Sequence, residues 1–444
     1  MTVGWLLERE RKWDVVVVDK TGSVGLDAHA LHIPPGDPML KNARTVDVDL
    51  PIRMHTPSYY YNLIDLMRAL EVETTDYYQD IALFDSKSNH IVSYSNQKIG
   101  SFTIPMVNGI SWSSAWYCWQ FLRFRWSAKR DLQSGSSHGK NLYDYLKQNN
   151  YSEDFIQNFL FTYLSMVCTC SYTALKVYPV EPILKFITSI SSGRSLRHFK
   201  FGTKDLARRL EKPLNTKYGV GVNKLHLQKD GKVSVLFEDG TEELFDSVII
   251  ATEPTAAHSM IKDIPELSSI AEALSKFPVE KSSISVHTDL SLLPMGRNSP
   301  KNSMISRANT VEAHSLLQKS VEALSDVDIK LIQTWSTKCP AKPSTVYKEA
   351  IMSRAILTLE SLDAVQVLKR EQGKHNIWVV GAYVDGNIPL LEAGVSSAIS
   401  IAERLGVALP WKKHVPQKHN SYSEKITVFI LLIVIVAILV FFLY

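Results

Sequence analysis

The stretch Asp14-Val-Val-Val-Val-Asp19 decides the fold class, because four consecutive β-branched residues run up to an acid. A continuous apolar run of this kind is typical of a strand buried on both faces of a parallel sheet. The preceding segment, Val3 to Lys12, is apolar at first and then charged, which is typical of the second half of a helix. The helix–strand order predicts a doubly wound α/β fold whose first strand would come before Met1.

Two later runs have the same character. Asp246-Ser-Val-Ile-Ile-Ala-Thr252 ends in small residues, and Asn376-Ile-Trp-Val-Val-Gly381 has a glycine at its tip. A helical pattern from about Leu391 to Leu405 follows the second run. In a doubly wound sheet the ligand lies outside the carboxyl ends of the strands, so these strand ends predict one shared ligand site.

The chemistry of the three strand ends suits a dinucleotide. The Asp19 carboxylate could accept hydrogen bonds from both hydroxyls of an adenosine ribose, and Lys20 and Gly25 follow in a loop that could approach phosphates. Gly381 lets the backbone approach a ligand, and the helix starting near Leu391 offers free amides to a pyrophosphate or an isoalloxazine carbonyl. The alternatives are that Asp19 caps a turn and that Gly381 belongs to an ordinary β-turn-α connection.

Other segments predict further helices and strands. Apolar periodicity and capping residues predict helices at 60–70, 142–147, 152–163 and 204–214. A hairpin is expected to join 231–237 to 243–245, and 283–288 alternates like a strand with one face in a core.

Composition argues against several kinds of function. With 49 basic and 45 acidic residues the formal net charge is +4, too balanced for a nucleic-acid partner. Cys168 and Cys170 are separated by one residue, which is poor spacing for a chelating pair, and no metal site is predicted. We interpret them as buried free thiols in a reducing compartment. No Gly-x-Ser-x-Gly elbow is present, which argues against a serine hydrolase.

The last 19 residues, Ile426 to Tyr444, contain no charge, proline or glycine. As a helix they would extend about 28 Å, close to the hydrocarbon thickness of a bilayer. The alternative, a buried strand or core helix, would need polar punctuation. Basic residues before the span favour the cytosolic side, and the N-terminus has no signal-peptide pattern. We therefore expect a single-pass tail anchor with the domain in the cytosol, at the endoplasmic reticulum rather than the mitochondrial outer membrane.

Six motifs occur in a fixed order: Val18-Asp-Lys20, Gly25-Leu-Asp-Ala-His-Ala30, Thr45-Val-Asp-Val48, Asp239 to Thr252, Val286-His-Thr-Asp-Leu-Ser-Leu-Leu-Pro294, and Trp378 to Glu392. Together they resemble the superfamily of flavin-containing amine oxidases and phytoene-desaturase-like proteins, within it a branch of FAD/NAD(P)-binding oxidoreductases. The resemblance spans roughly residues 2–406, and the last motif is the most specific.

The resemblance implies a Rossmann-like FAD-binding domain intertwined with an α+β substrate domain. The FAD-binding parts would be 1–50, 200–258 and 371–409, and the substrate parts 51–199, largely helical, and 259–370. A polar tether at 410–425 and the transmembrane helix at 426–444 would follow. The implied cofactor-binding residues are Asp19, Lys20, Gly25, His29, Val222, Thr252, Gly381, Asp385, Gly386, Ile388 and Gly394. The catalytic residue stays unknown: His287 is one candidate, although a lone strand histidine is more often structural.

The chain departs from the family pattern at its start. The family begins with a strand and a Gly-x-Gly-x-x-Gly turn before the first helix, and this chain has neither. Leu26-Asp27 also stands where a second glycine is usual. Because those glycines let the helix start touch the pyrophosphate, we expect weaker FAD binding and a sheet that lacks a central strand.

Two functions follow. The leading hypothesis is an FAD-dependent oxidoreductase at a membrane, which moves hydride from a small molecule, an amine or a lipid-like compound, to the flavin. The alternative is a catalytically inactive, cofactor-free binding protein of the same fold, tethered to the membrane. A nicotinamide-only dehydrogenase is weaker, because the Gly-x-Tyr-x-x-Gly-Ile-Pro motif suits a flavin.

Overall fold

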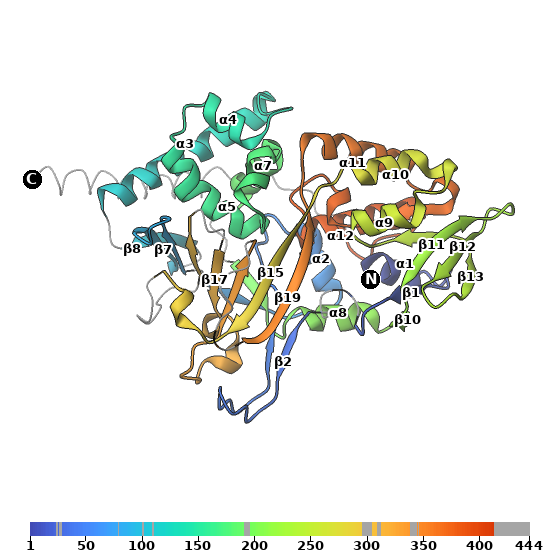
Figure 1. Ribbon diagram of the computed structural model, residues 1–444, viewed down its shortest axis with the longest axis horizontal. Helices are drawn as coiled ribbons and strands as arrows, with labels where there is room; N and C mark the ends of the chain where they lie inside the picture. Colours follow the sequence, from blue (N-terminus) through green and yellow to red (C-terminus); the bar gives the residue numbers. More distant parts are fainter. Residues whose placement is uncertain are drawn as a thin grey trace, which may run out of the picture.

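The structure is a computed structural model. It describes residues 1–23, 25, 29–78, 80–99, 102–108, 111–190, 196–294, 304–308, 312–337, 344 and 346–412 (Figure 1). The predicted transmembrane helix at 426–444 and most of the predicted tether at 410–425 lie outside these ranges. Within them, no helix is both long and apolar enough to span a bilayer.

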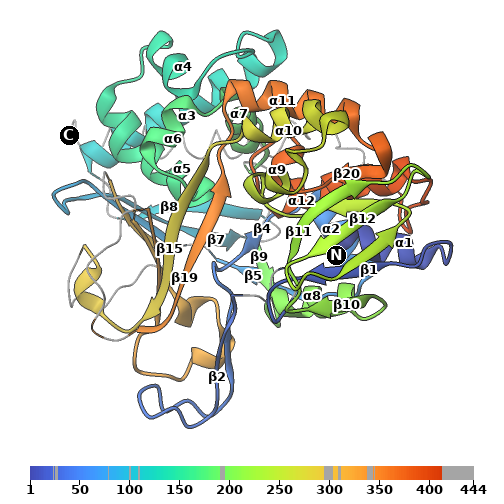
Figure 2. The same ribbon diagram turned by 45° about the vertical axis from the view of Figure 1, so that its right-hand side comes forward.

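Two groups of elements lie side by side (Figures 1 and 2). In the first group the parallel strands form two pairs. β1 (Val16–Asp19) runs parallel to β10 (Asn215–Tyr218), and β14 (Val248–Ile250) runs parallel to β20 (Ile377–Val379). The three predicted strands therefore exist, and the α/β fold class is confirmed.

The prediction that these strands are buried on both faces was wrong. Every residue of β1 is half-buried, and in β14 only Ile250 is buried. Among the residues that the structure describes, β1 and β14 each pair along one edge, in a two-stranded sheet. A strand inside a larger parallel sheet would be covered at both edges as well as by helices on its faces.

Helices pack around these strand pairs. α1 (Thr2–Arg9) buries Val3, Leu6 and Leu7, whose helical spacing forms one apolar face, in a core shared with α12 (Leu391–Arg404). The predicted helices at 60–70, 204–214 and 391–405 are confirmed. The remaining helices of this group are α2 (Tyr61–Ala69), α8 (Thr203–Glu211), α9 (Pro254–Ile261), α10 (Ser268–Ser275) and α11 (Leu359–Glu371).

The predicted hairpin is confirmed. β12 (Val233–Phe237) pairs with β13 (Glu242–Phe245), and β11 (Val222–Leu227) adds a third antiparallel strand. The turn between β12 and β13 uses residues that suit it. Asp239 Oδ1 accepts a hydrogen bond from Thr241 N at 2.9 Å, and Gly240 adopts a φ of +85°, which glycine tolerates.

An eight-stranded sheet forms the second group, in the order β19-β15-β18-β17-β16-β6-β7-β8. Its neighbours are antiparallel except for β6 and β16, which are parallel. The strand predicted at 283–288 is part of β15. The strands are β6 (Asp80–Phe84), β7 (His90–Ile99), β8 (Phe102–Asn108), β15 (Val279–His287), β16 (Met304–Arg307), β17 (Glu312–Leu316), β18 (Ile332–Ser336) and β19 (Val346–Ala355).

Helices cover one side of this sheet (Figure 2). The helix predicted at 152–163 begins where Phe155 N donates to Ser152 Oγ at 3.2 Å, and it continues through a π-helical stretch into α5. In the same region Cys168 and Cys170 are buried free thiols, as expected. The helices are α3 (Trp112–Ser134), α4 (Leu142–Gln148), α5 (Phe161–Cys168), α6 (Tyr172–Val177) and α7 (Val180–Ser189).

The expectation that 51–199 is largely helical holds only for its second half. The first half carries the strands β4 to β8: β6, β7 and β8 pair in sequence order, and β6 pairs in addition with β16 from far along the chain. The predicted domain boundaries stay a prediction. The small sheets are β2 (Leu31–Ile33) with β3 (Val46–Val48), and β4 (Met54–His55) with β9 (Leu196–Phe199) and β5 (Thr74–Tyr77).

Candidate functional site

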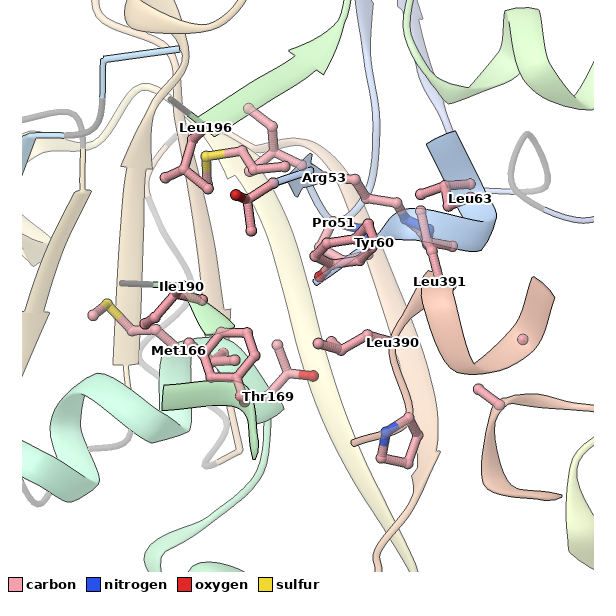
Figure 3. Close-up of a pocket in the computed structure, with 18 of the residues that line it drawn as sticks. Pro51, Arg53, Tyr60, Leu63, Met166, Thr169, Ile190, Leu196, Leu390 and Leu391 are labelled. Atoms are coloured by element: carbon pink, nitrogen blue, oxygen red, sulfur yellow. The ribbon is translucent and has the colours of Figure 1, made fainter. Parts of the chain in front are cut away.

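A cavity of about 760 Å³ lies between the two groups of elements. Its walls come from α1, α2 and α12 on one side, and from α3, α5 and the eight-stranded sheet on the other. Figure 3 shows Arg53 and Tyr60 on one wall, with Met166 and Thr169 across the cavity. Ligand pockets usually measure about 300–1,000 Å³, so this one can take a sizeable organic molecule.

One end of the cavity is rich in glycine. We define the glycine cradle as Met1, Thr2, Gly25, Gly381 and Gly394, all of which line the cavity. It brings together the start of α1, the loop after β1, the tip of β20 and the first turns of α12. Three of the predicted cofactor residues therefore meet at one place.

Asp19 lies just behind the cradle. Its Oδ1 accepts from Thr21 N at 2.8 Å and from Thr21 Oγ1 at 2.6 Å, so it does cap the turn that follows β1. The Asp19 carboxylate also lies close to the Met1 α-ammonium: burial lowers the pKa of that ammonium, and Asp19 opposes the shift. Val220 N donates to Asp19 O at 3.2 Å, which brings the start of β11, where Val222 lies, to the same strand end.

The other two strand ends also meet. Tyr383, two residues after the cradle residue Gly381, donates its hydroxyl to Thr252 O at 3.2 Å. Ala251, one residue before Thr252, lines the cavity itself. The ends of β14 and β20 thus face the same space as the start of α1.

Several predicted cofactor residues do not line the cavity. Lys20 and His29 are exposed, and Ile388 is fully buried in the core. Asp385 and Gly386 form a turn behind the wall, where Gly386 has a φ of +90° and faces Val365 of α11. The turn carries the chain to Pro389 and Leu390, which return to the cavity wall.

His287 also lies outside the cavity wall. It is fully buried: its Nε2 is 2.7 Å from Thr334 Oγ1, and its Nδ1 accepts from Asp289 N at 3.1 Å. Burial lowers the pKa of His287 to about 4, so the ring is neutral at pH 7. Thr334 Oγ1 is also 2.9 Å from His314 Nδ1, which makes the histidine part of a buried polar network.

A buried acid fixes the helix that carries the cradle residue Gly394. The Glu392 carboxylate accepts from Asn62 N at 3.1 Å, Asn62 Nδ2 at 2.9 Å and Leu63 N at 3.0 Å. These bonds join the start of α12 to the start of α2 and satisfy free amides at the N-terminus of α2. Burial raises the pKa of Glu392 to about 7.

The other end of the cavity is built from side chains. We define the chamber by the aromatic residues that line it: Tyr94, Phe121, Phe159, Tyr163 and Phe186. They come from β7, α3, the π-helical stretch before α5, α5 and α7. All five fall in the part of the chain, 51–199, that was expected to belong to the substrate domain, but the sequence identified none of these side chains individually.

Two arginines lie where the cradle meets the chamber. Arg53 and Arg354, the arginine pair, both line the cavity near Tyr60. Removal from water and repulsion by Arg354 lower the pKa of Arg53 to about 10, while Asp49 opposes the shift. Sequence reasoning missed this pair, although an arginine between the apolar Ile52 and Met54 is a signal that could have found it.

The residues present fit a flavin cofactor. A Cβ added at Gly394 would meet no atom within 4 Å, so the space beside this glycine is open to a ligand. The starts of α1 and α12 line that space with Thr2 and Leu391, and a helix start suits phosphate or carbonyl oxygens, although the amide of Gly394 itself donates to Leu390 O at 3.2 Å. No cluster of His, Cys, Asp and Glu suited to a metal occurs in the described part of the chain.

Residues 52–286 match the family of flavin-containing amine oxidoreductases. The chain belongs to this family. It is accordingly a flavin-dependent oxidoreductase that acts on a small molecule, as the resemblance predicted. No curated protein sequence matches the chain.

Solved structures share the fold at low sequence identity. Cyclohexylamine oxidase from Brevibacterium oxydans has a TM-score of 0.60 at 13% identity, covering 91% of this chain and 97% of its own. Putrescine oxidase has a TM-score of 0.63 at 10% identity, covering 92% and 96%. A fatty acid isomerase from P. acnes has a TM-score of 0.58 at 12% identity, covering 91% and 95%. At these identities the likeness concerns the fold.

Proposed function

We propose that the protein is an FAD-dependent oxidoreductase that moves hydride from a small-molecule substrate to the flavin. The observation that carries the proposal is that one cavity joins the glycine cradle to the chamber. When bound, the flavin supplies the redox chemistry by accepting the hydride. The protein's own part is to hold the dinucleotide in the open space beside Gly394 and the start of α1, and to orient the substrate in the chamber.

Asp19 supports FAD over a smaller flavin. Its Oδ2 accepts no hydrogen bond from the described residues, whereas its Oδ1 is held by Thr21. Asp19 and Val222 do not line the cavity, but Asp19 lies close to the Met1 α-ammonium of the cradle and is joined through Val220 N to the start of β11, where Val222 lies. An adenosine placed there would offer its ribose hydroxyls to the open carboxylate oxygen.

The test compares the purified full chain after incubation with FAD, FMN or NAD, and reads the visible absorbance after gel filtration. We expect the yellow flavin spectrum with FAD, at close to one flavin per chain, and weaker retention of FMN. Asp19→Ala should weaken FAD binding by about tenfold or more and leave FMN binding unchanged, since it removes hydrogen bonds to a charged acceptor. A protein that retains neither flavin would contradict the proposal and favour the cofactor-free alternative.

We further propose that the chain is tail-anchored with its domain on the cytosolic face of the endoplasmic reticulum. The apolar segment 426–444 and the basic residues before it support this proposal. A chain truncated after residue 412 should move from the membrane fraction to the supernatant. A glycosylation site added after Tyr444 should be modified in the full chain, and an unmodified site would contradict the endoplasmic reticulum.

A further inference from the structure

The cavity wall has an unusual charge balance. Three of its residues are arginines, Arg53, Arg125 and Arg354. No aspartate, glutamate, lysine or histidine lines it among the residues that the structure describes. A protonated amine bound inside would therefore meet cations and no carboxylate, whereas an anion would be attracted.

The arginine pair is placed to bind an anion. Arg354 donates one nitrogen, Nη1, to Pro389 O at 3.0 Å, which fixes the guanidinium against the loop that leads to α12. Arg53 makes no hydrogen bond or salt bridge with another described residue, although Asp49 lies within electrostatic reach. Both guanidinium groups line the cavity, close enough for Arg354 to lower the pKa of Arg53, and two such groups can bind a carboxylate with several charge-assisted hydrogen bonds.

Tyr60 adds a neutral donor to the same place. The Tyr60 side chain is buried, and burial together with Glu392 raises its pKa, so the hydroxyl keeps its proton. Figure 3 shows Tyr60 beside Arg53, with Leu390 and Leu391 next to them. The anion site is therefore bordered by apolar side chains that would hold an attached hydrocarbon chain.

The chamber suits such a hydrocarbon body. Beyond its five aromatic residues, its wall is made largely of aliphatic and methionine side chains, among them Met166, Val167 and Ile190. Burial of apolar surface against walls of this kind supplies binding energy without requiring a polar partner. A molecule with one anionic end and a long apolar body would match both parts of the cavity.

We propose that the substrate is a carboxylic acid with a hydrocarbon chain, bound with its carboxylate on the arginine pair and Tyr60 and its chain in the chamber. This inference rests on the proposed function, since it names the substrate class of the same site. It differs from the amine that the family name suggests.

The experiment uses four probes with the same ten-carbon chain: decanoate, decyl phosphate, decylamine and decanol. The full chain is first loaded with FAD and its flavin content is read from the spectrum. Binding of each probe is then measured by calorimetry. Decanoate should bind most tightly, about tenfold or more better than decanol, with decylamine the weakest.

Substitutions of Arg53 test whether the arginine pair causes the preference for decanoate. Arg53→Gln should reduce decanoate binding about tenfold or more and leave decanol binding unchanged, while Arg53→Lys should keep part of the preference because it keeps the charge. The matched control is Arg370→Gln, an exposed arginine away from the cavity wall, which should change none of the four affinities.

The outcomes separate the two proposals. A chain that takes up no flavin contradicts the proposed function before any probe is added. A flavin-loaded chain that binds decylamine more tightly than decanoate overturns the carboxylate inference alone. Preference for decyl phosphate over decanoate overturns it too, and assigns the arginine pair to a phosphate.

Discussion

At one end of the cavity three glycines leave backbone without side chains in the wall, with Gly25, Gly381 and Gly394 beside the start of α1. At the other end it is aromatic rings, and the arginine pair lies where the two ends meet. A backbone wall recognises what all flavin dinucleotides share, because amide dipoles and open space do not depend on the substrate. A side-chain wall selects one substrate class, and it is here that members of a common fold diverge.

The largest effect should come from filling the cradle. Gly394→Leu should reduce FAD affinity a hundredfold or more, roughly 3 kcal/mol, because its side chain would occupy the open space beside the glycine. Gly394→Ala should stabilise the protein by about 0.5–1 kcal/mol through helix propensity and still weaken FAD binding.

Thermal unfolding and flavin titration measure the two effects of each substitution. If Gly394→Ala raises the thermal stability but weakens FAD binding, the glycine is needed for ligand binding rather than for the fold. Unchanged FAD affinity in Gly394→Leu would mean that the cofactor lies elsewhere.

A second prediction concerns Glu392, the buried acid behind the cradle. Its pKa rises from 4.5 to about 7 in the folded state, so the protonated form is favoured there. This contribution to stability is fully present below pH 4.5 and is lost as the pH rises through 7, up to about 3 kcal/mol.

Comparison with Glu392→Gln isolates this contribution. The variant imitates the protonated acid and should lack this part of the pH dependence. The measurement is the free energy of unfolding of both proteins by urea between pH 4.5 and 8. If the free energy of unfolding changes with pH in the same way in both proteins, Glu392 is not the source of this pH dependence.

The two ends of the cavity also differ in how far the sequence predicted them. The cradle end could be predicted from the sequence, because a glycine at a strand tip and an acid after an apolar run are local signals, as Gly381 and Asp19 show. The arginine pair was not, since Arg53, just before β4, and Arg354, in β19, lie far apart along the chain and come together only in the folded protein. The same limit applied to the fold: the pairing of β6 with β16 joins segments far apart along the chain, and no local pattern predicts it.

The smallest effect should come from His287. Its partners Thr334 and Asp289 place it in a buried network away from the cavity wall. His287→Gln should lower the free energy of unfolding by about 1–2 kcal/mol. It should leave kcat unchanged, measured with a substrate that the enzyme turns over. A large fall in kcat with normal stability would instead make His287 a catalytic residue and would move the chemistry out of the chamber.

The account depends most on the claim that cofactor and substrate share the one cavity. A crystal structure of the full chain with FAD and decanoate tests it directly. We predict the flavin along Gly25, Gly381 and Gly394, with its ring facing the chamber and the carboxylate on Arg53 and Arg354. A flavin bound at another surface, or decanoate separated from it by protein, would contradict the account.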